Sequence, residues 1–587
     1  MRTSSRRRAV LMALVAGFAM TASACAGIPT SGPVSKVADD SGFGESTVRY
    51  SPARPLPGAS PQQVVRGYLD AMLAFPASSG TVSTFLTPGA AKTWKSLAGV
   101  RVYSQSGVLL SGPSTAPGAK PQLGSAAPVV VRLGIVDNAQ LDQQGHYTRR
   151  VSRSNINYRL QLVDGEWRIS NPQPGLLVTS KFFTDYFRQL DIYFFDRPGE
   201  RLVPDPVHLA VGDRLPTALI SSLARGAAGG SDVMRTFVPG LRSLSPSVPV
   251  NSDGVADVEF DADLDAVNES SREHLSAQII WTLRQVPGIS AVRVFGGDTA
   301  LNTGGDAAQS IESWGAYGPS VAKVRAFALA GDKVIQINDD SVEPLTGAWG
   351  RDARGATKIA VSDDGVAGVL AARSQVRVTN RKGGDVRTFG GYRLIDPRWD
   401  DDGGLWMVDR ASPQTRVRRV VGGAVQTLDT GSLATLDVRV FALSPDASRY
   451  AVTVDTGGGR SAIYVGTIRR DAKDRVIGLG EPVRVFITAA RPRSATWTSG
   501  TELSFLADSN SGVQVYTAAI DGSATTGGAS GGGALLPDVR AGSLVVGSGT
   551  TPTQYATDAR RRLWNLVPGR SWKLLDTTGV TGLTSGR

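Results

Sequence analysis

The residue types that most often catalyse reactions or bind metals are scarce in this chain. It has a single cysteine, Cys25, and three histidines, His146, His208 and His274, which are far apart in the sequence. Zinc sites of the common cysteine and histidine types are therefore not expected. A histidine could act as a general base only if folding supplied distant partners, and His274 follows Glu273 on what reads as the solvated face of a helix. We predict no catalytic residues and no metal site.

Two short motifs resemble functional sites but have simpler explanations. Residues 528–532 read Gly-Ala-Ser-Gly-Gly and match the G-x-S-x-G pattern of serine hydrolases. That nucleophile elbow needs a strand before the serine and a helix after it, whereas this stretch has the composition of a linker. The acidic run 400–402 could bind a cation, but it lacks the alternating ligand spacing of a calcium loop. We predict a hairpin turn there, and another at the Asp-Asp-Gly of 363–365.

The N-terminus has the three parts of a bacterial secretory leader. A basic start precedes the apolar run 9–20, which is shorter than a membrane span of about 20 residues, and small residues follow. Ala22, Ser23, Ala24 and Cys25 resemble a lipobox, in which the cysteine receives diacylglycerol and an N-acyl lipid, although Leu is more common at the position of Ala22. The alternative is an ordinary signal peptide with an incidental cysteine. Because an exported protein with one unpaired thiol is unusual, we predict a lipid anchor at the outer face of the cell membrane, and no other cofactor.

The composition is that of a folded protein with several domains. The chain has 587 residues, 41% hydrophobic and 20% charged, with 68 Gly and 32 Pro, which favour many turns and short strands. Removal of the leader lowers the formal charge from +11 to +7, because it takes away four arginines, Arg2, Arg6, Arg7 and Arg8. A mild positive charge suits anionic lipid or acidic wall polymer. Without a dense basic patch and interleaved aromatic residues, nucleic acid is not an expected partner.

The first folded region is predicted to be an α+β domain over residues 61–180. The leader, 1–24, and a tether rich in Gly, Pro and Ser, 25–60, precede it. Apolar residues recur at helical spacing from Pro61 to Leu73. A second short helix and a run of strands follow, at 88–97, 100–103, 129–136, 158–163 and 165–169. Helices followed by strands resemble the NTF2-like fold, in which a curved sheet wraps helices.

The second region, 185–301, alternates strands with helices. Strands are predicted at 191–195, 202–204, 255–260 and 292–295, and helices at 216–225 and from Ser270 onward. The Ser270-x-x-Glu273 pattern is that of a capping box, and Leu275, Ile279, Leu283 and Val286 form the buried stripe of the second helix. Four segments in this order resemble the GerMN domain of bacterial envelope and sporulation proteins, namely 217–219, 255–258, 278–283 and 287–289. The resemblance implies a small α+β module without an assigned catalytic apparatus.

The third region, 317–587, follows a linker at 302–316 and contains a degenerate repeat. Each copy has an apolar strand, a turn rich in Ser, Asp or Gly and a second apolar strand; turns begin near Ser362, Asp400, Ser444 and Thr498, with a worn fifth copy near Thr557. The intervals of 38, 44, 54 and 59 residues are typical of β-propeller blades. We predict five or six blades; the alternative is a β-sandwich with chance similarity between turns. The fold class is therefore multidomain, with α+β regions followed by an all-β propeller.

The lipobox, the α+β region, the GerMN-like module and the propeller-like region, in this order, resemble the actinobacterial LpqB lipoprotein family. The resemblance spans nearly the full length and is most specific in the GerMN-like segment and in residues 311–350. It implies an accessory factor of the neighbouring Mtr two-component system, which contacts the extracytoplasmic part of the sensor kinase and influences cell-wall and division homeostasis. It brings no catalytic residues, and only the lipid-bearing role carries over, to Cys25.

Two functions from different classes therefore stand at this point. The first is a regulator without enzymatic activity, held beside a sensor kinase by its lipid and acting by protein contact. The second is a protein that binds cell-wall glycan or peptide, including a hydrolase with carboxylates in the propeller channel. The first predicts recovery of a kinase from membranes, and the second predicts retained or cleaved wall fragments.

Overall fold

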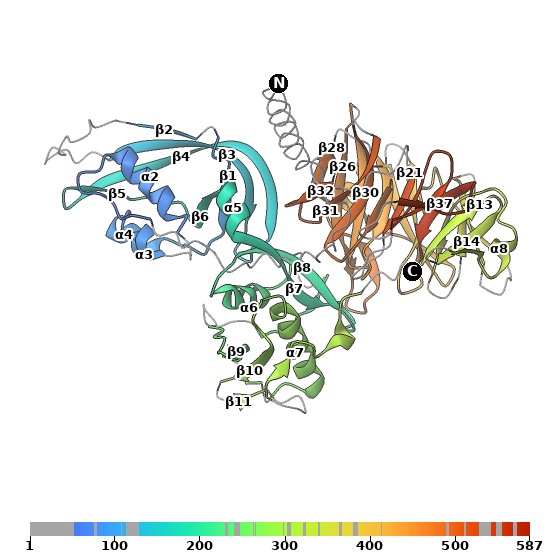
Figure 1. Ribbon diagram of the computed structural model, residues 1–587, viewed down its shortest axis with the longest axis horizontal. Helices are drawn as coiled ribbons and strands as arrows, with labels where there is room; N and C mark the ends of the chain where they lie inside the picture. Colours follow the sequence, from blue (N-terminus) through green and yellow to red (C-terminus); the bar gives the residue numbers. More distant parts are fainter. Residues whose placement is uncertain are drawn as a thin grey trace, which may run out of the picture. The chain divides into compact units, whose positions relative to one another are not determined.

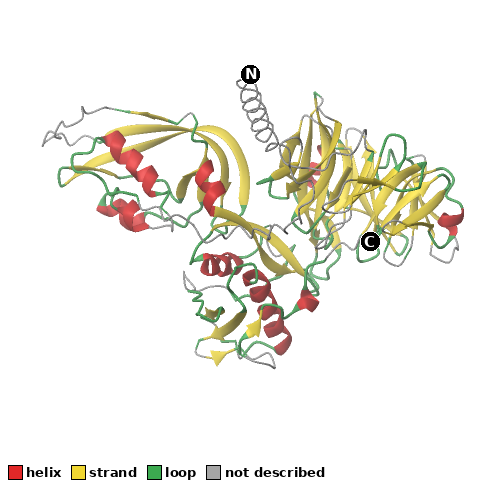
Figure 2. Ribbon diagram, in the orientation of Figure 1, coloured by secondary structure: helices red, strands yellow, loops and turns green. Residues whose placement is uncertain are grey.

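The computed structural model contains an N-terminal α+β domain, a second α+β domain and a β-propeller (Figure 1). Helices are concentrated in the first two domains, and strands make up nearly all of the third (Figure 2). The predicted fold class is confirmed. The structure describes residues 52–586 except for 75–78, 107, 113–127, 229–232, 240–246, 262, 265, 298, 302–306, 321–324, 339–340, 363–364, 366, 372, 380–385, 412–413, 459, 489–491, 493, 510–511, 528–541, 547–553 and 567–571.

The N-terminal domain holds three of its helices, α2, α3 and α4, against one face of a curved sheet, and α5 packs on the other face beside β1 and β6 (Figure 1). The strand order is β5-β4-β3-β1-β6, with β2 also paired to β3. Apolar side chains alternate along the long strands β3 and β4 and pack on the helices, which is the arrangement expected of an NTF2-like domain. The elements are α2 (Pro61–Ala71), α3 (Ser79–Ser83), α4 (Pro88–Thr93), β1 (Val100–Tyr103), β2 (Leu109–Ser111), β3 (Val129–Leu141), β4 (Tyr147–Val163), β5 (Glu166–Ile169), β6 (Leu176–Thr179) and α5 (Ser180–Tyr186).

Helix α2 begins at a capping box that the sequence analysis did not identify. The Ser60 hydroxyl accepts the Gln63 N–H, and the Gln63 side chain accepts the Ser60 N–H, so two otherwise unpaired donors of the first turn are satisfied. Pro61 occupies the first turn, where its missing N–H costs nothing. The buried face includes Val65 and Tyr68, and the Tyr68 ring meets that of Tyr158 edge to face at 5.7 Å.

The second domain is built around a two-stranded antiparallel ribbon, β7–β8, and a parallel pair, β9–β10. Helices α6 and α7 pack beside them and supply the core residues Leu219, Ile220, Ile279 and Ile280, which have no exposed surface. The elements are β7 (Phe187–Phe195), β8 (Leu202–Ala210), α6 (Leu215–Arg225), β9 (Val255–Phe260), α7 (Glu269–Leu283), β10 (Ala291–Gly296), β11 (Thr299–Ala300), β12 (Gln309–Ser310) and the 3-10 helix η1 (Gly315–Tyr317).

The predicted start of α7 was wrong. Asn268 caps the helix, because its side chain accepts the Ser271 N–H at 2.9 Å, and no box forms between Ser270 and Glu273. The predicted buried stripe is confirmed at three of its positions, but Val286 lies beyond the end of the helix and is half-buried. The helix is also buried outside that stripe: Gln278 is fully buried, accepts the Phe237 N–H and donates to the Tyr193 carbonyl.

Part of the predicted linker 302–316 belongs to this domain. Strand β12 pairs antiparallel with β10, with Ala291 opposite Ser310. The Trp314 indole donates to Gln309 Oε1 at 2.8 Å, and the Trp314 carbonyl accepts from the Trp281 indole at 3.1 Å. The segment after residue 306 is therefore held by a strand and two tryptophans.

The propeller has six blades, each an antiparallel sheet of four or more strands. The ring is closed by pairing the last strand, β37, with β13, from Ala326 opposite Ser585 to Ala330 opposite Val580, with a shift of register between Phe327 and Leu329. Closure leaves no open edge between the first and last blades. The blades are β37-β13-β14-β15, β16–β19, β20–β23, β24–β28, β29–β32 and β33–β36.

The bounds of the propeller elements follow the repeat. They are β13 (Ala326–Ala330), β14 (Lys333–Asn338), β15 (Ser341–Pro344), α8 (Ala348–Arg351), β16 (Ala356–Val361), β17 (Ala367–Ala371), β18 (Gln375–Thr379), β19 (Arg387–Gly390), β20 (Arg398–Trp399), β21 (Leu405–Ala411), β22 (Gln414–Val421), β23 (Ala424–Thr427), η2 (Gly431–Thr435), β24 (Val438–Leu443), β25 (Arg449–Gly457), β26 (Arg460–Arg470), β27 (Val476–Leu479), β28 (Val483–Thr488), β29 (Ser494–Trp497), β30 (Glu502–Ser509), β31 (Gly512–Ala519), β32 (Thr525–Gly527), β33 (Ser543–Val546), β34 (Gln554–Thr557), β35 (Leu563–Leu566), β36 (Trp572–Leu574) and β37 (Val580–Ser585).

The fifth copy of the repeat was assigned one strand too late. The turns at Ser362, Asp400, Ser444 and Thr498 each follow the first strand of a blade, whereas the turn at Thr557 follows the second strand, β34. Because the fifth copy was placed on the second strand of its blade instead of the first, the interval from Thr498 to Thr557 is the longest, at 59 residues. The turn at Thr557 looks most like the turn at Asp400, because each has an aspartate six residues before a tryptophan whose indole donates to it, in the pairs Asp558–Trp564 and Asp400–Trp406.

Candidate functional site

The predicted lipid anchor precedes the described residues. Cys25 and the lipobox positions Ala22, Ser23 and Ala24 lie before residue 52, and their roles remain predictions. The G-x-S-x-G match at 528–532 and the aspartates of 363–365 also lie outside the described residues. Within the part of the chain that the structure describes, no helix is long and apolar enough to cross a membrane.

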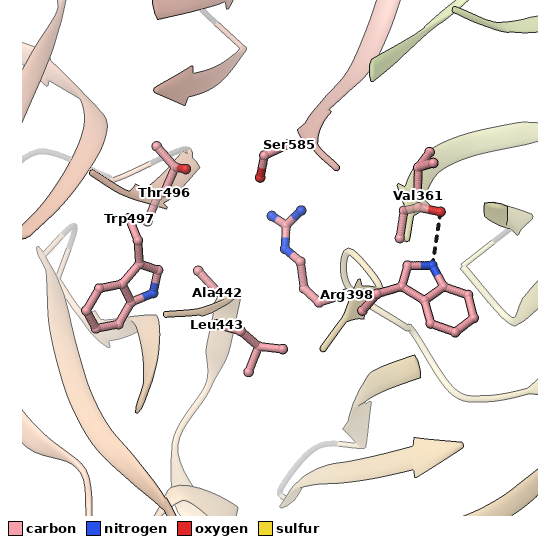
Figure 3. Close-up of a pocket in the computed structure, with 10 residues that line it drawn as sticks. Val361, Arg398, Ala442, Leu443, Thr496, Trp497 and Ser585 are labelled. Atoms are coloured by element: carbon pink, nitrogen blue, oxygen red, sulfur yellow. Dashed lines mark hydrogen bonds between the residues drawn. The ribbon is translucent and has the colours of Figure 1, made fainter. Parts of the chain in front are cut away.

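The first strands of the six blades line the propeller channel, which is narrow. Figure 3 shows the Arg398 side chain extending into it, with its guanidinium group pointing toward Ser585. Arg398 Nη1 donates to Thr584 Oγ1 at 2.5 Å, and its Nε donates to the Phe441 carbonyl at 3.3 Å. A cavity beside Arg398, lined by Val361, Trp399 and Trp497 among others, has a volume of about 40 Å³. That is room for roughly three water molecules or fewer, and a sugar ring does not fit.

The second cavity in the channel contains one carboxylate, which is paired. Asp396 Oδ2 lies 2.9 Å from Lys358 Nζ. Burial alone would raise the pKa of Asp396, but Lys358 and Arg398 more than offset this and hold the pKa below its usual value. Glycosidases that use two carboxyl groups place them on either side of the scissile bond, whereas Asp396 is the only acidic residue lining the two described cavities. The geometry does not support the hydrolase alternative in this channel.

The acidic run 400–402 forms the β20–β21 hairpin turn, as predicted. Asp400 Oδ1 accepts the Gly404 N–H at 2.7 Å, and Oδ2 accepts from the Trp406 indole and Arg419 Nε, both at 2.6 Å. Protein donors from its own blade therefore use the lone pairs that a cation would need. Among the described residues, no group of three or more His, Cys, Asp or Glu side chains is placed to hold a metal ion.

His274 packs among aromatic rings, so the predicted solvated face was wrong at this position. Its ring lies 4.4 Å from that of Phe237, 4.6 Å from that of Phe195 and 5.0 Å from that of Tyr317. Nε2 lies 2.8 Å from the Gly199 carbonyl and Nδ1 2.5 Å from the Ser270 carbonyl. Both ring nitrogens therefore face backbone acceptors, which gives His274 a structural role between α7 and the β7–β8 ribbon.

Folding brings the other two histidines to strand β8, where side chains from all three domains meet. Strand β8 is buried on both faces over residues 202–208, unlike a strand with one face in solvent. The His208 N–H donates to the Gly145 carbonyl at 2.8 Å, which joins β8 to the β3–β4 turn. We call the ionisable residues gathered here the β8 charge cluster: Asp142, His146, Asp191, Asp205, His208, Arg449 and Asp521.

Asp205 is the centre of this cluster. Its Oδ2 lies 3.1 Å from His146 Nε2 and accepts the Ala228 N–H at 2.8 Å, while its Oδ1 lies 3.4 Å from Arg449 Nη2 in the propeller. His146 Nδ1 lies 3.0 Å from Asp142 Oδ2. Asp205 and Arg449 are 2% and 4% exposed, so these charges depend on each other for compensation.

A second link joins β8 to the propeller. His208 Nε2 lies 2.9 Å from Asp521 Oδ2, in the turn after β31, and both side chains are buried. In addition, Arg197 Nη2 donates to the Asp471 carbonyl at 3.1 Å. Gly500 lies against Pro204 of β8, where a β-carbon would come within 2.6 Å of the proline ring. The contact is close enough to require glycine.

The cluster shifts two pKa values in ways that affect the charge balance. Burial would lower the pKa of His146, but Asp142 and Asp205 more than offset this and raise it to about 10, so His146 is a cation at neutral pH. Burial, with repulsion from Asp205 and Asp521, raises the pKa of Asp191 to about 7 despite the nearby Arg449. Asp191 Oδ1 has no hydrogen-bond partner. The cluster is therefore partly protonated near neutrality.

Family models match all three domains. The LpqB N-terminal domain matches residues 54–184, and the LpqB beta-propeller domain matches residues 332–583. Between them, the Germane family, described as sporulation and spore germination, matches residues 191–299. The chain belongs to the LpqB lipoprotein family. The resemblance found in the sequence is confirmed, and a lipoprotein family implies a membrane-anchored protein.

Several relatives named Lipoprotein LpqB align over nearly their whole length. The protein of Cutibacterium acnes is 26% identical over 89% of this chain and 90% of its own, and that of Rhodococcus opacus is 24% identical over 97% of both. Among solved structures, a putative TolB from Agrobacterium tumefaciens has a TM-score of 0.33 at 12% identity, covering 45% of this chain and 93% of its own. A gluconolactonase from Xanthomonas campestris has a TM-score of 0.29 at 17% identity, covering 44% and 88%. Structural likenesses of this size bear on neither fold nor function.

Sequence reasoning missed the acidic and basic members of the β8 charge cluster. Asp191, Asp205, Arg449 and Asp521 lie in four different elements or turns, and no local spacing connects them. One signal was present: Asp205 and His208 interrupt an otherwise apolar strand, which predicts either partners or exposure. The sequence could not distinguish these outcomes, because the partner residues are up to 313 positions away.

Proposed function

We propose that this protein is a lipid-anchored accessory regulator of an Mtr-type sensor kinase. In this proposal, acyl chains on Cys25 hold the three domains at the extracytoplasmic face of the membrane, and a protein contact influences signalling linked to the cell wall and division. The chain acts without an enzymatic step and with no cofactor other than its covalent lipid. Membership of the LpqB lipoprotein family supports this reading.

The closed propeller channel is the observation that carries the proposal. The cavities that the described residues form in it have room for only a few water molecules, and the one carboxylate lining them is paired with a lysine. The outer surfaces of the blades therefore offer a larger area than the channel for contact with a partner protein. The β8 charge cluster supports the proposal as well, because it links a blade to the second domain by compensated buried charges.

Anchoring explains how a modest contact could be effective. Two proteins confined to the same membrane meet at a raised effective concentration, so high affinity in solution is not required. The regulator biases the kinase only to the extent that it binds one of the kinase conformations more tightly than the other. The relevant quantity is thus a difference in affinity between two kinase states.

The test is crosslinking in intact membranes, followed by affinity purification of this chain and identification of the captured proteins. The parent and a Ser23→Ala variant, which keeps the cysteine and a small residue before it, should both recover a sensor kinase. The Cys25→Ser variant should leave the membrane fraction and recover none. Repeated absence of any kinase, or a Cys25→Ser variant that is still membrane-bound and fully active, would overturn the proposal. Recovery of muropeptides instead would favour the wall-binding alternative.

A further inference from the structure

The N-terminal sheet has one face packed on α2, α3 and α4. The other face is covered by α5 near β1 and β6 and is open to solvent over the rest of the sheet. Along β3 and β4, Val131, Leu133 and Tyr158 point to the helices and have no exposed surface. Residues of the opposite parity pair with each other across the two strands, as Arg132 does with Asn157, and both are exposed. No described element packs on this open face, which is formed by β2, β3, β4 and β5.

The open face is basic. Four arginines project from it, none with an ion pair among the described residues: Arg132, Arg153, Arg159 and Arg168. Among the described residues, the only carboxylate that β2 to β5 place on this face is that of Glu166, at the start of β5, which accepts the Gly58 N–H. Asp137 of β3 lies on the opposite face, buried and paired with Arg101. By contrast, arginines of the blades β20–β28 are paired with aspartates, as in the pairs Arg410–Asp437, Arg418–Asp409 and Arg419–Asp400. The unpaired arginines therefore form a local field of one sign.

Large aliphatic side chains protrude among these arginines. Leu109 is 70% exposed, Val151 is 67% exposed and Val130 is 42% exposed. Val130 lies directly opposite Arg159 in the register, and Leu109 lies opposite Gly134 on the next strand. Exposed aliphatic residues on a basic surface are costly in water but suit the boundary between headgroups and acyl chains.

We propose that the open face of this sheet rests on an anionic phospholipid surface. Guanidinium groups bind phosphate in a bidentate geometry, while the protruding aliphatic side chains enter the headgroup layer. The position in the chain is suitable, because only 26 residues lie between Cys25 and Pro52, so a lipid on Cys25 would keep this domain close to the membrane. The inference depends on the proposed function in one respect, which is the lipid anchor that brings this domain to the membrane.

Vesicle binding by the chain from Ala26 to Arg587, which carries no lipid, tests this surface. The chain should sediment with vesicles of phosphatidylcholine containing phosphatidylglycerol, not with phosphatidylcholine alone, and should be released by high salt. A variant with Arg132→Gln, Arg153→Gln and Arg159→Gln should bind about 100-fold more weakly, from roughly fivefold for each arginine. The matched control carries Arg460→Gln, Arg484→Gln and Arg560→Gln, three exposed arginines of the propeller, and should bind within about twofold of the parent.

A second measurement does not depend on the arginine variants. Because the chain from Ala26 has no cysteine, Val151→Cys can carry a single environment-sensitive dye. Its emission should shift to the blue on anionic vesicles, whereas a dye at Val250→Cys, an exposed position in the second domain, should not respond. Equal weakening of both arginine triples, an unresponsive dye at residue 151, or binding to soluble acidic polymer but not to vesicles would overturn the inference. These assays omit the lipid, so their failure leaves the kinase proposal standing, and failure to recover a kinase leaves this surface standing.

Discussion

Two buried aspartates, Asp400 and Asp205, show how differently this protein compensates charge in its propeller and at strand β8. Asp400 is satisfied within one blade, by donors 4, 6 and 19 positions away. Asp205 is satisfied by His146 and Arg449, which lie 59 and 244 positions away in two other domains. The exposures are nearly equal, at 3% and 2%. What differs is whether the partners are local.

The difference separates two roles of buried charge. A carboxylate compensated inside a blade stabilises that blade whether or not the neighbouring domains are docked. A carboxylate compensated by other domains is left buried and unpaired if they separate, so it links their folding. We therefore expect the propeller to be a self-contained unit and the β8 charge cluster to be the coupling element.

Of the substitutions considered, Asp205→Ala should lower the free energy of unfolding most. It leaves Arg449 buried without its partner and removes one of the two acids beside His146, and breaking a buried pair in this way costs about 3–5 kcal/mol. Because the propeller keeps its own pairs, we expect calorimetry to resolve a separate propeller transition that the parent lacks. Asp213→Ala, at an exposed position of the same domain, is the control and should unfold like the parent. An unaltered single transition for Asp205→Ala would show that β8 does not couple the domains.

Asp400→Ala should destabilise by about 2–3 kcal/mol, from the loss of charged hydrogen bonds to Trp406 and Arg419. Hydrogen exchange should speed up in β20–β23 and stay unchanged in β8. The neighbouring Asp402→Ala, at a half-exposed position that also contacts Arg419, is the control and should cost less than about 1 kcal/mol. Faster exchange in β8 as well would contradict the view that blades are self-contained.

The β8 charge cluster should weaken as the pH rises, through His146. The pKa of His146 is about 10 in the folded protein, against 6.5 for an ordinary histidine, which stands for the unfolded chain. The charged His146 therefore stabilises the folded protein fully below about pH 6.5, and this stabilisation is lost as the pH approaches 10. A single group with these values changes the free energy of unfolding by at most about 1.4 kcal/mol per pH unit. His146→Gln should flatten the dependence between pH 7 and 9, measured by denaturant unfolding. If the variant and the parent kept parallel pH profiles, His146 would not be the titrating group.

The sequence predicted the parts of the fold that depend on local patterns. Strand β1 has the predicted bounds of 100–103, and α6 begins one residue before the predicted 216–225, because alternation and helical periodicity report burial directly. The start of α7 was misassigned since Ser270 and Glu273 have the spacing of a capping box, while the functional cap, Asn268, lies two residues earlier. Spacing alone does not show which polar side chain reaches the free N–H groups.

The β8 charge cluster could not be predicted because its pairing arises only from tertiary structure. The contact between Asp205 and Arg449 requires the second domain to dock on the β24–β28 blade, and nothing in the flanking residues of either one specifies the other. The lining of the channel could not be predicted for the same reason. Arg398 lies in a stretch identified as a repeat, but its contact in the channel, with Thr584 of β37, depends on closure of the ring by that strand. Local pattern identified the elements, and long-range docking determined what their polar residues do.

Asp191→Asn should have the smallest effect, and it should be stabilising. The folded chain keeps the Asp191 proton up to about pH 7, whereas an unfolded chain releases it near 3.8, so ionisation of this residue lowers stability progressively between those values. Its Oδ1 has no hydrogen-bond partner to lose, and an amide there could donate to the carboxylates of Asp205 or Asp521. We expect Asp191→Asn to raise the free energy of unfolding at pH 8 and to change it little at pH 4, measured by urea unfolding.

The contrast with Asp205 makes this last variant informative. Both aspartates lie in the same cluster, but one holds cations from two domains and the other is an excess acid with an unpartnered oxygen. If Asp191→Asn destabilised the protein at pH 8 as Asp205→Ala does, then Asp191 would be ionised and paired with Arg449. The cluster would then balance its charge through two carboxylates, and the coupling assigned to Asp205 would be shared between β7 and β8.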